Sequence, residues 1–373
     1  MEFIKGKKVL VSGASMAGLS TALCLSKIGY RVTVVELAKA PRTNGAAVDI
    51  KDDAIADIRR MGVYDQLKLH RLQVNMVSFK NASDITENSI LLNSEHLEEF
   101  DEIEIERDQF VKVMLDQLKN DVEFIFSDRI IDLTESEDGI IASFQQGKQE
   151  TYHFVVGCDG LHSGVRNLWF GEENKYAQFL GAYFSFSIID KLLIEEKTMQ
   201  MFNVPGKAIT LNAYNGKTDI IFCTLSEDEI LYNYRDIAWQ RKFISDGFSS
   251  EGWRTAELLN EVANAAHFYF DKFAQIKMPS WTKGRVVLVG DAGYCASPAA
   301  GMGASLSIRG ATVLADALLK HKGNLKLAFE EYNQNLRPLI NEVQEMAVLN
   351  LKDKFIPRTE EAIRQRNAQQ LPF

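Results

Sequence analysis

The stretch that decides the fold is Val9-Leu10-Val11-Ser12-Gly13-Ala14-Ser15-Met16-Ala17-Gly18, close to the N-terminus. It begins as an apolar run typical of a buried strand, and glycine at position 13 permits a tight turn out of that strand. Residues 16–29 have the pattern of a packed helix, and residues 31–36 form the next apolar strand. The sequence therefore predicts a βαβ unit with a right-handed crossover and a parallel sheet.

This strand–turn–helix suits the binding of a dinucleotide. Gly18 lets the helix pack closely on the sheet, and the helix N-terminus offers N–H groups and a positive dipole end to a pyrophosphate. Glu36, at the tip of the second strand, is placed to accept hydrogen bonds from ribose hydroxyls. Ser15 replaces the central glycine of the usual GxGxxG pattern, and its small side chain still allows close approach. A nucleophile elbow at Ser15 is disfavoured, because the final glycine of GxSxG is missing.

Composition and charge exclude several classes of function. The 373 residues are 46% hydrophobic and 25% charged, as in a globular protein, and the net charge of -9 argues against a nucleic-acid partner. No apolar run reaches the roughly 20 residues that span a bilayer, and the N-terminus is unlike a signal peptide. The 4 cysteines and 6 histidines lack metal-site spacing, so we expect no metal and a reducing, cytoplasmic setting.

Two later turns resemble the first one. The apolar strand 153–157 leads into Cys158-Asp159-Gly160, which is followed by Leu161-His162-Ser163-Gly164-Val165-Arg166. The apolar strand 285–290 ends in Gly290-Asp291-Ala292, and Pro298-Ala299-Ala300-Gly301-Met302-Gly303 comes soon after. Three such turns, spread over most of the chain, indicate one long cofactor that is held at several points.

The sequence pattern changes between residues 176 and 275, where aromatic and β-branched residues alternate with polar ones. This alternation predicts an antiparallel sheet with one packed face and one face toward a cavity. The expected fold class is α/β: a discontinuous Rossmann-like nucleotide-binding domain, an inserted antiparallel-sheet substrate domain and a long C-terminal helix. The expected boundaries are 1–72, 104–175 and 276–325 for the first domain, 73–103 and 176–275 for the second, and 326–373 for the C-terminal helices.

With these motifs in this order, the chain resembles the class A (single-component) FAD-dependent monooxygenases of the para-hydroxybenzoate hydroxylase type, which include tetracycline-inactivating enzymes. The resemblance implies FAD as cofactor and NADPH or NADH as a transient co-substrate. It also implies hydroxylation of an aromatic or polycyclic small molecule, such as a tetracycline-like antibiotic, with O2 through a flavin C4a-hydroperoxide. Because the flavin carries this chemistry, no catalytic side chain is expected. A monomer or a homodimer would be consistent with it.

The resemblance also assigns residues to the cofactor. Asp291 would hydrogen-bond the ribityl chain, Arg107 would reach the flavin from a helix start, and the backbone of 301–303 would lie against the pyrimidine edge. Asp159 and Arg166 would serve the pyrophosphate and the passing nicotinamide, and the loop 42–49 would skirt the flavin ring. The complete expected set is Gly13, Ser15, Met16, Ala17, Gly18, Glu36, Arg42, Arg107, Asp159, Arg166, Asp291, Pro298, Gly301, Met302 and Gly303.

Plainer roles are open for the charged members of this set. Asp291 could simply cap the next helix, Arg166 could form a surface ion pair, and Arg107 could be a solvated first-turn residue. Two positions depart from the family pattern: Gly293-Tyr294 stands where many relatives have Ala-His, and Leu37 stands where arginine often follows the ribose-binding glutamate.

The substrate is expected between the sheet domain and the flavin. Side chains on these strands alternate between two faces, so about half of the aromatic candidates must be plain core. Two alternatives are a flavin-dependent reductase or dehydrogenase that works without oxygen, and a non-catalytic binder of a hydrophobic compound. The substrate candidates are Tyr183, Phe184, Phe186, Met201, Tyr214, Phe222 and Tyr294, with Met199 and Phe202 on the same strands.

Overall fold

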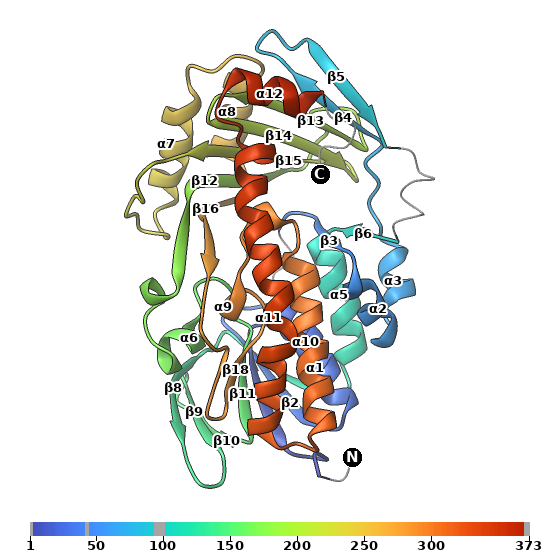
Figure 1. The fold of residues 1–373 in the computed structure, drawn as a ribbon, viewed down its shortest axis with the longest axis vertical. Helices are drawn as coiled ribbons and strands as arrows, with labels where there is room; N and C mark the ends of the chain where they lie inside the picture. The colour runs from blue at the N-terminus through green and yellow to red at the C-terminus, as the bar shows by residue number, and fades with distance from the viewer. Residues whose placement is uncertain (1–2, 42–44, 93–100, 369–373) are drawn as a thin grey trace. The chain divides into compact units, whose positions relative to one another are not determined.

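The chain forms two compact units in the computed structural model, which describes residues 3–41, 45–92 and 101–368 (Figure 1). The expected separate C-terminal region is divided, because its residues to Glu345 belong to the first unit and those from Met346 to the second. The first unit comprises Met1–Arg71, Glu102–Gln178 and Ala274–Glu345, and the second comprises Leu72–Asp101, Phe179–Phe273 and Met346–Phe373.

A six-stranded sheet organises the first unit in the order β17-β18-β11-β1-β2-β7. Neighbouring strands of this sheet are parallel, except that the edge strand β17 pairs antiparallel with β18. The central strands are apolar and buried, as expected of parallel strands that are covered on both faces. The strands are β1 (Lys8–Ser12), β2 (Arg31–Glu36), β7 (Val122–Phe126), β11 (Phe154–Gly157), β17 (Thr282–Lys283) and β18 (Val286–Leu288).

Helices and two small sheets complete the first unit. Helix α1 contacts α10 and α5, and α10 also contacts α2. The helices are α1 (Met16–Lys27), α2 (Asp53–Arg60), α3 (Tyr64–Lys68), α5 (Arg107–Leu118), α6 (Gly164–Trp169), α9 (Asp291–Tyr294), α10 (Gly303–Lys320) and the start of α11 (Leu325–Asn350), with the short turns η1 (Glu173–Lys175) and η2 (Pro298–Ala300). The small sheets pair β3 (Val48–Ile50) with β6 (Ile103–Ile105), and β8 (Ile130–Glu135) with β9 (Ile140–Phe144) and β10 (Gln149–Tyr152).

A seven-stranded sheet, in the order β16-β12-β15-β14-β13-β4-β5, forms most of the second unit. Strands β12, β15, β14 and β13 pair antiparallel in turn, and β13 pairs in parallel with β4. The strands are β4 (Met76–Lys80), β5 (Thr86–Leu91), β12 (Ala177–Ile189), β13 (Thr198–Val204), β14 (Lys207–Tyr214), β15 (Lys217–Leu225) and β16 (His267–Ile276). The longest of the three segments of this unit begins within β12 and ends within β16.

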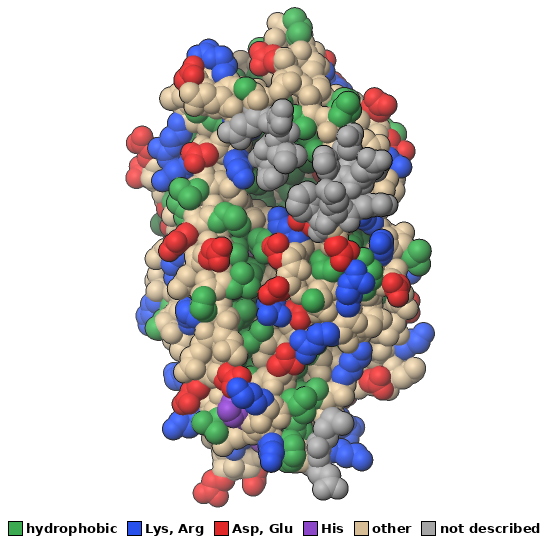
Figure 2. Space-filling view, turned by 45° about the vertical axis from the view of Figure 1, so that its right-hand side comes forward, with side chains coloured by type: hydrophobic (Ala, Val, Ile, Leu, Met, Phe, Trp, Pro, Cys, Tyr) green, Lys and Arg blue, Asp and Glu red, His purple; other side chains and the backbone are tan. Residues whose placement is uncertain are grey.

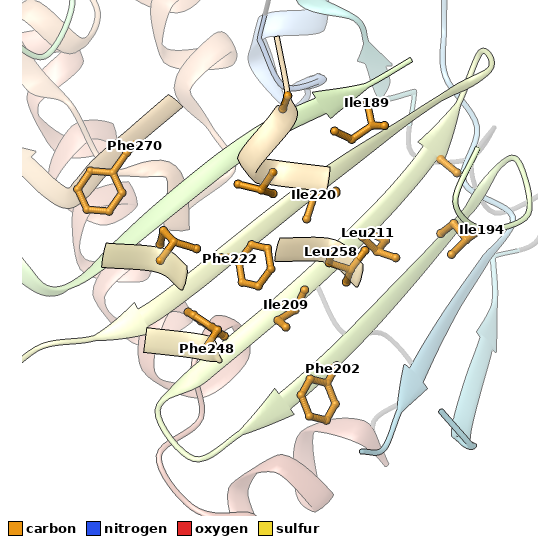
Figure 3. Packing of buried hydrophobic residues seen from close by; sticks show 14 of the residues in the cluster. Ile189, Ile194, Phe202, Ile209, Leu211, Ile220, Phe222, Phe248, Leu258 and Phe270 are labelled. Atoms are coloured by element: carbon orange, nitrogen blue, oxygen red, sulfur yellow. The ribbon is translucent and has the colours of Figure 1, made fainter. Parts of the chain in front are cut away.

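One face of this sheet is packed against two amphipathic helices, α7 (Ile237–Phe248) and α8 (Thr255–Asn264) (Figure 3). Every second residue of the strands points into this hydrophobic core, as the two-residue period of a strand requires. The core includes Tyr183, Phe202, Ile209, Leu211, Ile220, Phe222, Phe248, Leu258 and Phe270.

The C-terminal segment covers part of the same unit. The turn η3 (Leu351–Phe355) follows α11, and α12 (Glu360–Asn367) follows η3. Arg366, only 2% exposed, donates from Nη2 to Asn203 Oδ1 at 2.7 Å and lies over the ring of Phe79, 4.9 Å from its centroid. Burial lowers the pKa of Arg366 to about 10. This arginine therefore anchors α12 to the sheet.

The surface carries mixed charges. On the face shown in Figure 2, acidic and basic side chains are interspersed rather than gathered into blocks of one sign. Among the described residues, no helix is both long and apolar enough to cross a bilayer.

His153, beside strand β11, should give the first unit a pH-dependent stability. Burial, and after it the charges of Lys7 and Arg285, lower the pKa of His153 to about 4, from about 6.5 in an unfolded chain. A histidine with a lowered folded pKa contributes stability that is complete above about pH 6.5 and is lost as the pH falls toward 4. We expect His153→Gln to flatten the fall of the thermal midpoint over this interval. Exposed His70→Gln is the control, and an unchanged slope in His153→Gln would contradict the prediction.

Candidate functional site

The first turn is shaped by glycines that nothing larger could replace. Gly13 has φ +105°, and a Cβ added there would lie 2.5 Å from the carbonyl oxygen of Cys158. A Cβ on Gly18 would overlap the carbonyl oxygen of Gly13 itself. The turn after β1 therefore sits directly against the turn after β11, and α1 begins at Met16 with its N-terminus at this point.

Glu36 has a second role beside the one expected from the sequence. Its Oε2 accepts a hydrogen bond from the Ala14 amide at 2.8 Å, and its Oε1 accepts one from the Ala38 amide at 2.8 Å. The carboxylate therefore holds the first turn in shape. Each oxygen can accept more than one hydrogen bond, so both can still receive a ribose hydroxyl.

Arg107, the first residue of α5, reaches the same turn. Its Nη2 donates to the Ser15 hydroxyl at 2.6 Å. Gly45 makes room for this side chain, because a Cβ at position 45 would lie 2.8 Å from the Arg107 Cδ. Arg107 is in the first turn of α5 as expected, but it is bonded to Ser15 and is not simply solvated. Sequence reasoning missed Gly45, although a glycine inside the expected flavin loop was a visible signal.

Asp291 opens helix α9 next to this arginine. Burial raises the pKa of Asp291, while the charge of Arg107 and a hydrogen bond with Cys295 oppose the rise. The preceding Gly290 has φ +70°, and a Cβ there would lie 2.9 Å from the Cβ of Ala17 at the start of α1. The turn Gly290-Asp291-Ala292 therefore packs on the turn after β1. The carboxylate of Asp291 lies near the guanidinium of Arg107.

The turn after β11 is braced from within. Asp159 Oδ1 accepts from the Ser163 hydroxyl at 2.5 Å, and Asp159 Oδ2 accepts from the Val165 amide at 3.0 Å. The Ser163 hydroxyl in turn accepts from the Arg166 amide at 2.9 Å, which caps α6. Burial raises the pKa of Asp159. The carboxylate thus shapes the Asp-Gly turn.

Arg166 is wholly buried and spans two of the three motifs. Its guanidinium donates to the carbonyl of Ala292 at 2.9 Å, to the carbonyl of Leu161 at 2.6 Å and to Glu173 Oε2 at 2.7 Å. A surface ion pair is therefore the wrong interpretation. Because protein acceptors occupy its Nη atoms, we interpret Arg166 as the residue that positions α9 rather than as a cofactor contact.

The loop between α9 and α10 contains two residues with positive φ, Ser297 at +84° and Gly301 at +62°. The Ser297 hydroxyl accepts from the Ala299 amide at 3.4 Å, and α10 starts at Gly303. The N–H groups and positive dipole end of this helix can stabilise negative charge on a bound group. Pro298 and Gly301 are exposed, whereas Met302 is buried.

The strand β3 is tied to the start of α10. The Ser305 hydroxyl accepts from the Lys51 amide at 3.0 Å and donates to the Asp49 carbonyl at 3.3 Å. Burial raises the pKa of Asp49. No motif in the sequence marked Ser305, and its role appears only through this long-range contact. The expected cofactor residue Arg42 lies outside the described residues.

These contacts bring the three motifs together within the first unit, and the result fits FAD. Glu36 offers ribose acceptors, and the N-termini of α1 and α10 suit a pyrophosphate and an electron-rich ring. Space is open at Gly160 and Gly303, where an added Cβ would meet no atom of the described residues within 4 Å beyond the adjoining chain. Asp291 and Arg107 supply a carboxylate and a cation to the same group of turns.

Two hollows on the first unit are lined by residues outside the three motifs. One, of about 630 Å³, is bordered by His153 and Lys326, and the other, of about 320 Å³, by Trp281 and Arg337. They have no part in our assignment of the cofactor site, which rests on the contacts above.

The substrate candidates divide between different environments. Tyr183 and Phe222 belong to the core against α7 and α8, so they are structural residues of the second unit. Phe184 and Phe186 alternate with Tyr183 and point to the other face, since the register along β12 is continuous. Met201 and Tyr214 are on that same face, where Met201 packs with Val77, Phe79 and Ile90 and the Tyr214 hydroxyl donates to Asp219 Oδ2 at 2.8 Å. Of the neighbours considered, Phe202 is in the α7–α8 core and Met199 faces away from it.

Tyr294 is a core residue of the first unit. It is 1% exposed, its hydroxyl accepts a hydrogen bond from Tyr332 at 3.1 Å, and its ring meets Trp281 edge-on at 4.8 Å. The single turn of α9 directs it inward, where Gly310 of α10 makes room for its hydroxyl. We therefore leave Tyr294 out of the substrate proposal below.

Replacing Gly310 tests this packing. A Cβ at position 310 would overlap the Tyr294 hydroxyl, so we expect Gly310→Ala to lower the free energy of unfolding by about 1–3 kcal/mol, as overpacking does. The same change in a Tyr294→Phe background should cost less, because the overlapping oxygen is gone. Urea denaturation of the four proteins measures this, and equal costs in both backgrounds would contradict it.

Comparison with known proteins identifies the family of this chain. The sequence profile of the FAD-binding domain matches residues 7–344. A flavin-dependent monooxygenase from Legionella longbeachae is 33% identical over 367 residues, which cover 95% of this chain and 91% of that protein. Another, from an unknown prokaryotic organism, is 33% identical over 348 residues, covering 92% of this chain and 89% of that protein.

Solved structures agree with these sequence matches. The crystal structure of tetracycline destructase Tet(51) superimposes with a TM-score of 0.86 and 33% identity, covering 97% of this chain and 94% of that one. Together with the convergence of three nucleotide-binding turns, these matches show that the chain belongs to the FAD-binding family of flavin-dependent monooxygenases and is an FAD-dependent oxidoreductase of the aromatic hydroxylase type.

Proposed function

We propose that this monooxygenase takes electrons from NADPH or NADH and transfers one oxygen atom of O2 to a polycyclic, oxygen-rich small molecule of the tetracycline kind. The observation that carries the proposal is the likeness to tetracycline destructase Tet(51), which extends over 97% of the chain. That coverage includes the sheet of the second unit and not the FAD motifs alone.

In this proposal the second unit determines which substrate the enzyme accepts. The sheet face opposite α7 and α8 carries Phe184, whose ring packs on Phe273 at 4.9 Å, and it also carries Thr210 and Asn212. Asn212 is 6% exposed, and its Oδ1 has no partner among the described residues. A mainly apolar surface with a few polar groups suits a ring system that bears hydroxyl and amide groups.

The chain's own residues act on the cofactor in this proposal. Asp291 accepts from a ribityl hydroxyl, Glu36 from the ribose, and the N-terminus of α10 favours negative charge on the reduced ring. When bound, FAD supplies electron transfer and oxygen activation, which no side chain provides. Arg166 and Arg107 position the turns that make these contacts.

Turnover with candidate substrates tests the function. We expect tetracyclines to stimulate NADPH oxidation and O2 consumption by the purified flavoprotein, with a product heavier by one oxygen atom that comes from labelled O2. Product formed without oxygen would identify a reductase or dehydrogenase instead. Tight ligand binding without stimulated NADPH oxidation would identify a binder, and stimulation by simple phenols alone would exclude the tetracycline class.

A pair of phenylalanine variants tests the substrate face. We expect Phe184→Leu to raise KM by about fivefold with the flavin spectrum unchanged, because it removes uniform binding to the substrate ring. Phe222→Leu, on the α7–α8 face of the same sheet, should lower the thermal midpoint and leave KM alone. Steady-state kinetics with the best substrate decide this, and equal KM effects in both variants would argue against the face assignment.

A further inference from the structure

Two buried glutamines of the first unit belong to none of the three motifs. Gln275, in the last part of β16, is fully buried, and Gln344, on α11, is 4% exposed. A buried carboxamide is costly unless its polar atoms are bonded, and here the donors are bonded while the Oε1 of Gln275 has no partner among the described residues. An apolar side chain of the same volume would serve packing alone, so the bonds that these amides make are informative.

Both side chains donate to the segment that follows α9. Gln344 Nε2 donates to the carbonyls of Cys295 at 3.1 Å and Ile276 at 2.9 Å. Gln275 Nε2 donates to the carbonyl of Ala296 at 3.1 Å and to the backbone carbonyl of Gln344 at 2.7 Å. Two successive carbonyls, those of Cys295 and Ala296, thus each accept from one glutamine, and the two glutamines are themselves linked. The Cys295 carbonyl also accepts from the Ile276 amide at 3.0 Å, so Gln344 supplements a backbone bond there.

The held segment leads into the strained loop. Ser297 follows directly, with φ +84° and ψ +149°, a conformation that is almost confined to glycine. Such a conformation persists only where the surroundings fix it, and the fixed carbonyls of Cys295 and Ala296 are the immediate surroundings here. From Ser297 the loop turns through Pro298–Ala300 and Gly301 into the N-terminus of α10.

We propose that Gln275 and Gln344 are positioning residues for FAD: they set the path of the loop 297–303 and so aim its backbone at the flavin ring. The inference rests on the proposed contact between residues 301–303 and the flavin. Both carboxamides act through backbone carbonyls and touch no reacting atom. Their loss leaves Glu36 and the first turn in place, so the ring end of the cofactor is affected and its pyrophosphate end is not.

Substitution of Gln344 tests the proposal on the protein with and without FAD. In Gln344→Leu both donated bonds are lost, and we expect the dissociation constant of the apoprotein for FAD to rise about five- to tenfold, with a changed visible circular dichroism of bound flavin. In Gln344→Glu the ionised carboxylate faces two carbonyls, so the same changes should grow as the pH rises. Gln275→Met gives the same readouts if Gln344→Leu does not fold.

Gln240 provides a matched control. It is 1% exposed, and its Nε2 donates to the carbonyl of Tyr234 at 3.0 Å within the second unit. Gln240→Leu should lower stability and leave FAD affinity and flavin dichroism unchanged. The proposal is overturned if the Gln344 and Gln275 variants stay within twofold of the wild type with unchanged dichroism, or if Gln240→Leu changes the flavin equally.

The proposed contact itself has a separate test. Gly303→Ala adds a Cβ that meets no atom of the described residues within 4 Å beyond its own helix and chain neighbours, so we attribute a change in the flavin spectrum to the cofactor side. If this variant shifts the spectrum and the Gln344 variants do not, the contact stands and the positioning role is overturned. If the Gln344 variants alter the flavin and Gly303→Ala does not, the contact at Gly303 is wrong and the positioning role stands only through residues 301 and 302.

Discussion

Asp291→Asn should yield a folded protein that is purified largely without FAD. The carboxylate lies near the charge of Arg107, which opposes the rise in pKa that burial causes. Asparagine keeps the shape of this side chain without its charge, so we expect the fold to persist. What the carboxylate offers is a charged acceptor for a cofactor hydroxyl, and such bonds contribute about 1.5–3 kcal/mol. We therefore expect the dissociation constant for FAD to rise by roughly 10- to 100-fold.

The measurement is a titration of the apoprotein with FAD, followed by fluorescence quenching, beside a thermal melt. Asp57→Asn is the control, because Asp57 is also a buried carboxylate of the first unit but pairs with Arg309 between α2 and α10. Asp57→Asn should lose stability and keep its FAD affinity. If Asp291→Asn binds FAD as the wild type does, the ribityl role of Asp291 is wrong.

The cofactor motifs could be recognised in the sequence because their signals are local. A strand, a glycine turn and a helix start lie within ten or so residues of one another, and Gly13 is required by an approach that no side chain allows. The convergence of the first and last turns could be expected from the resemblance. Its physical basis, the contact of Gly290 with Ala17, lies between residues far apart in the chain.

The roles of several charged and polar residues could not be read in the same way. The sequence gives no sign that the guanidinium of Arg166 would reach the carbonyl of Ala292, or that Gln344 would hold that of Cys295. Each is a hydrogen bond between a side chain and a distant backbone carbonyl. Every residue has such a carbonyl, so the pattern of residue types does not indicate which one accepts the bond.

The sequence also does not determine which face of the sheet a candidate substrate residue lies on. Alternation places Tyr183 and Phe184 on opposite faces, but it does not say which face the helices cover. The positions of α7 and α8 decide this, and they put Tyr183 in the core. Tyr294 illustrates a related limit, because one short helical turn directs it inward toward Gly310.

Arg166→Met should have the largest effect on stability among the changes considered. The side chain is fully buried and donates to two backbone carbonyls and to Glu173. Its removal leaves buried acceptors without donors, and loss of one partner of a buried pair typically costs about 3–5 kcal/mol. We expect a cost near the lower end, about 3 kcal/mol, because Glu173 keeps His162 as a partner at 3.0 Å.

The variants Arg166→Lys and Arg364→Met make this prediction specific. Lysine keeps the charge but lacks the planar fork that serves three acceptors, so Arg166→Lys should recover only part of the lost stability. Arg364 is an exposed arginine of α12 paired with Glu361, and Arg364→Met should leave the urea midpoint unchanged.

Since Arg166 holds Ala292 next to Asp291, the Arg166 variants should also weaken FAD binding in proportion to their loss of stability. Full stability in Arg166→Met would show that the three bonds contribute nothing net, and normal stability with weak FAD binding would instead indicate a direct cofactor contact.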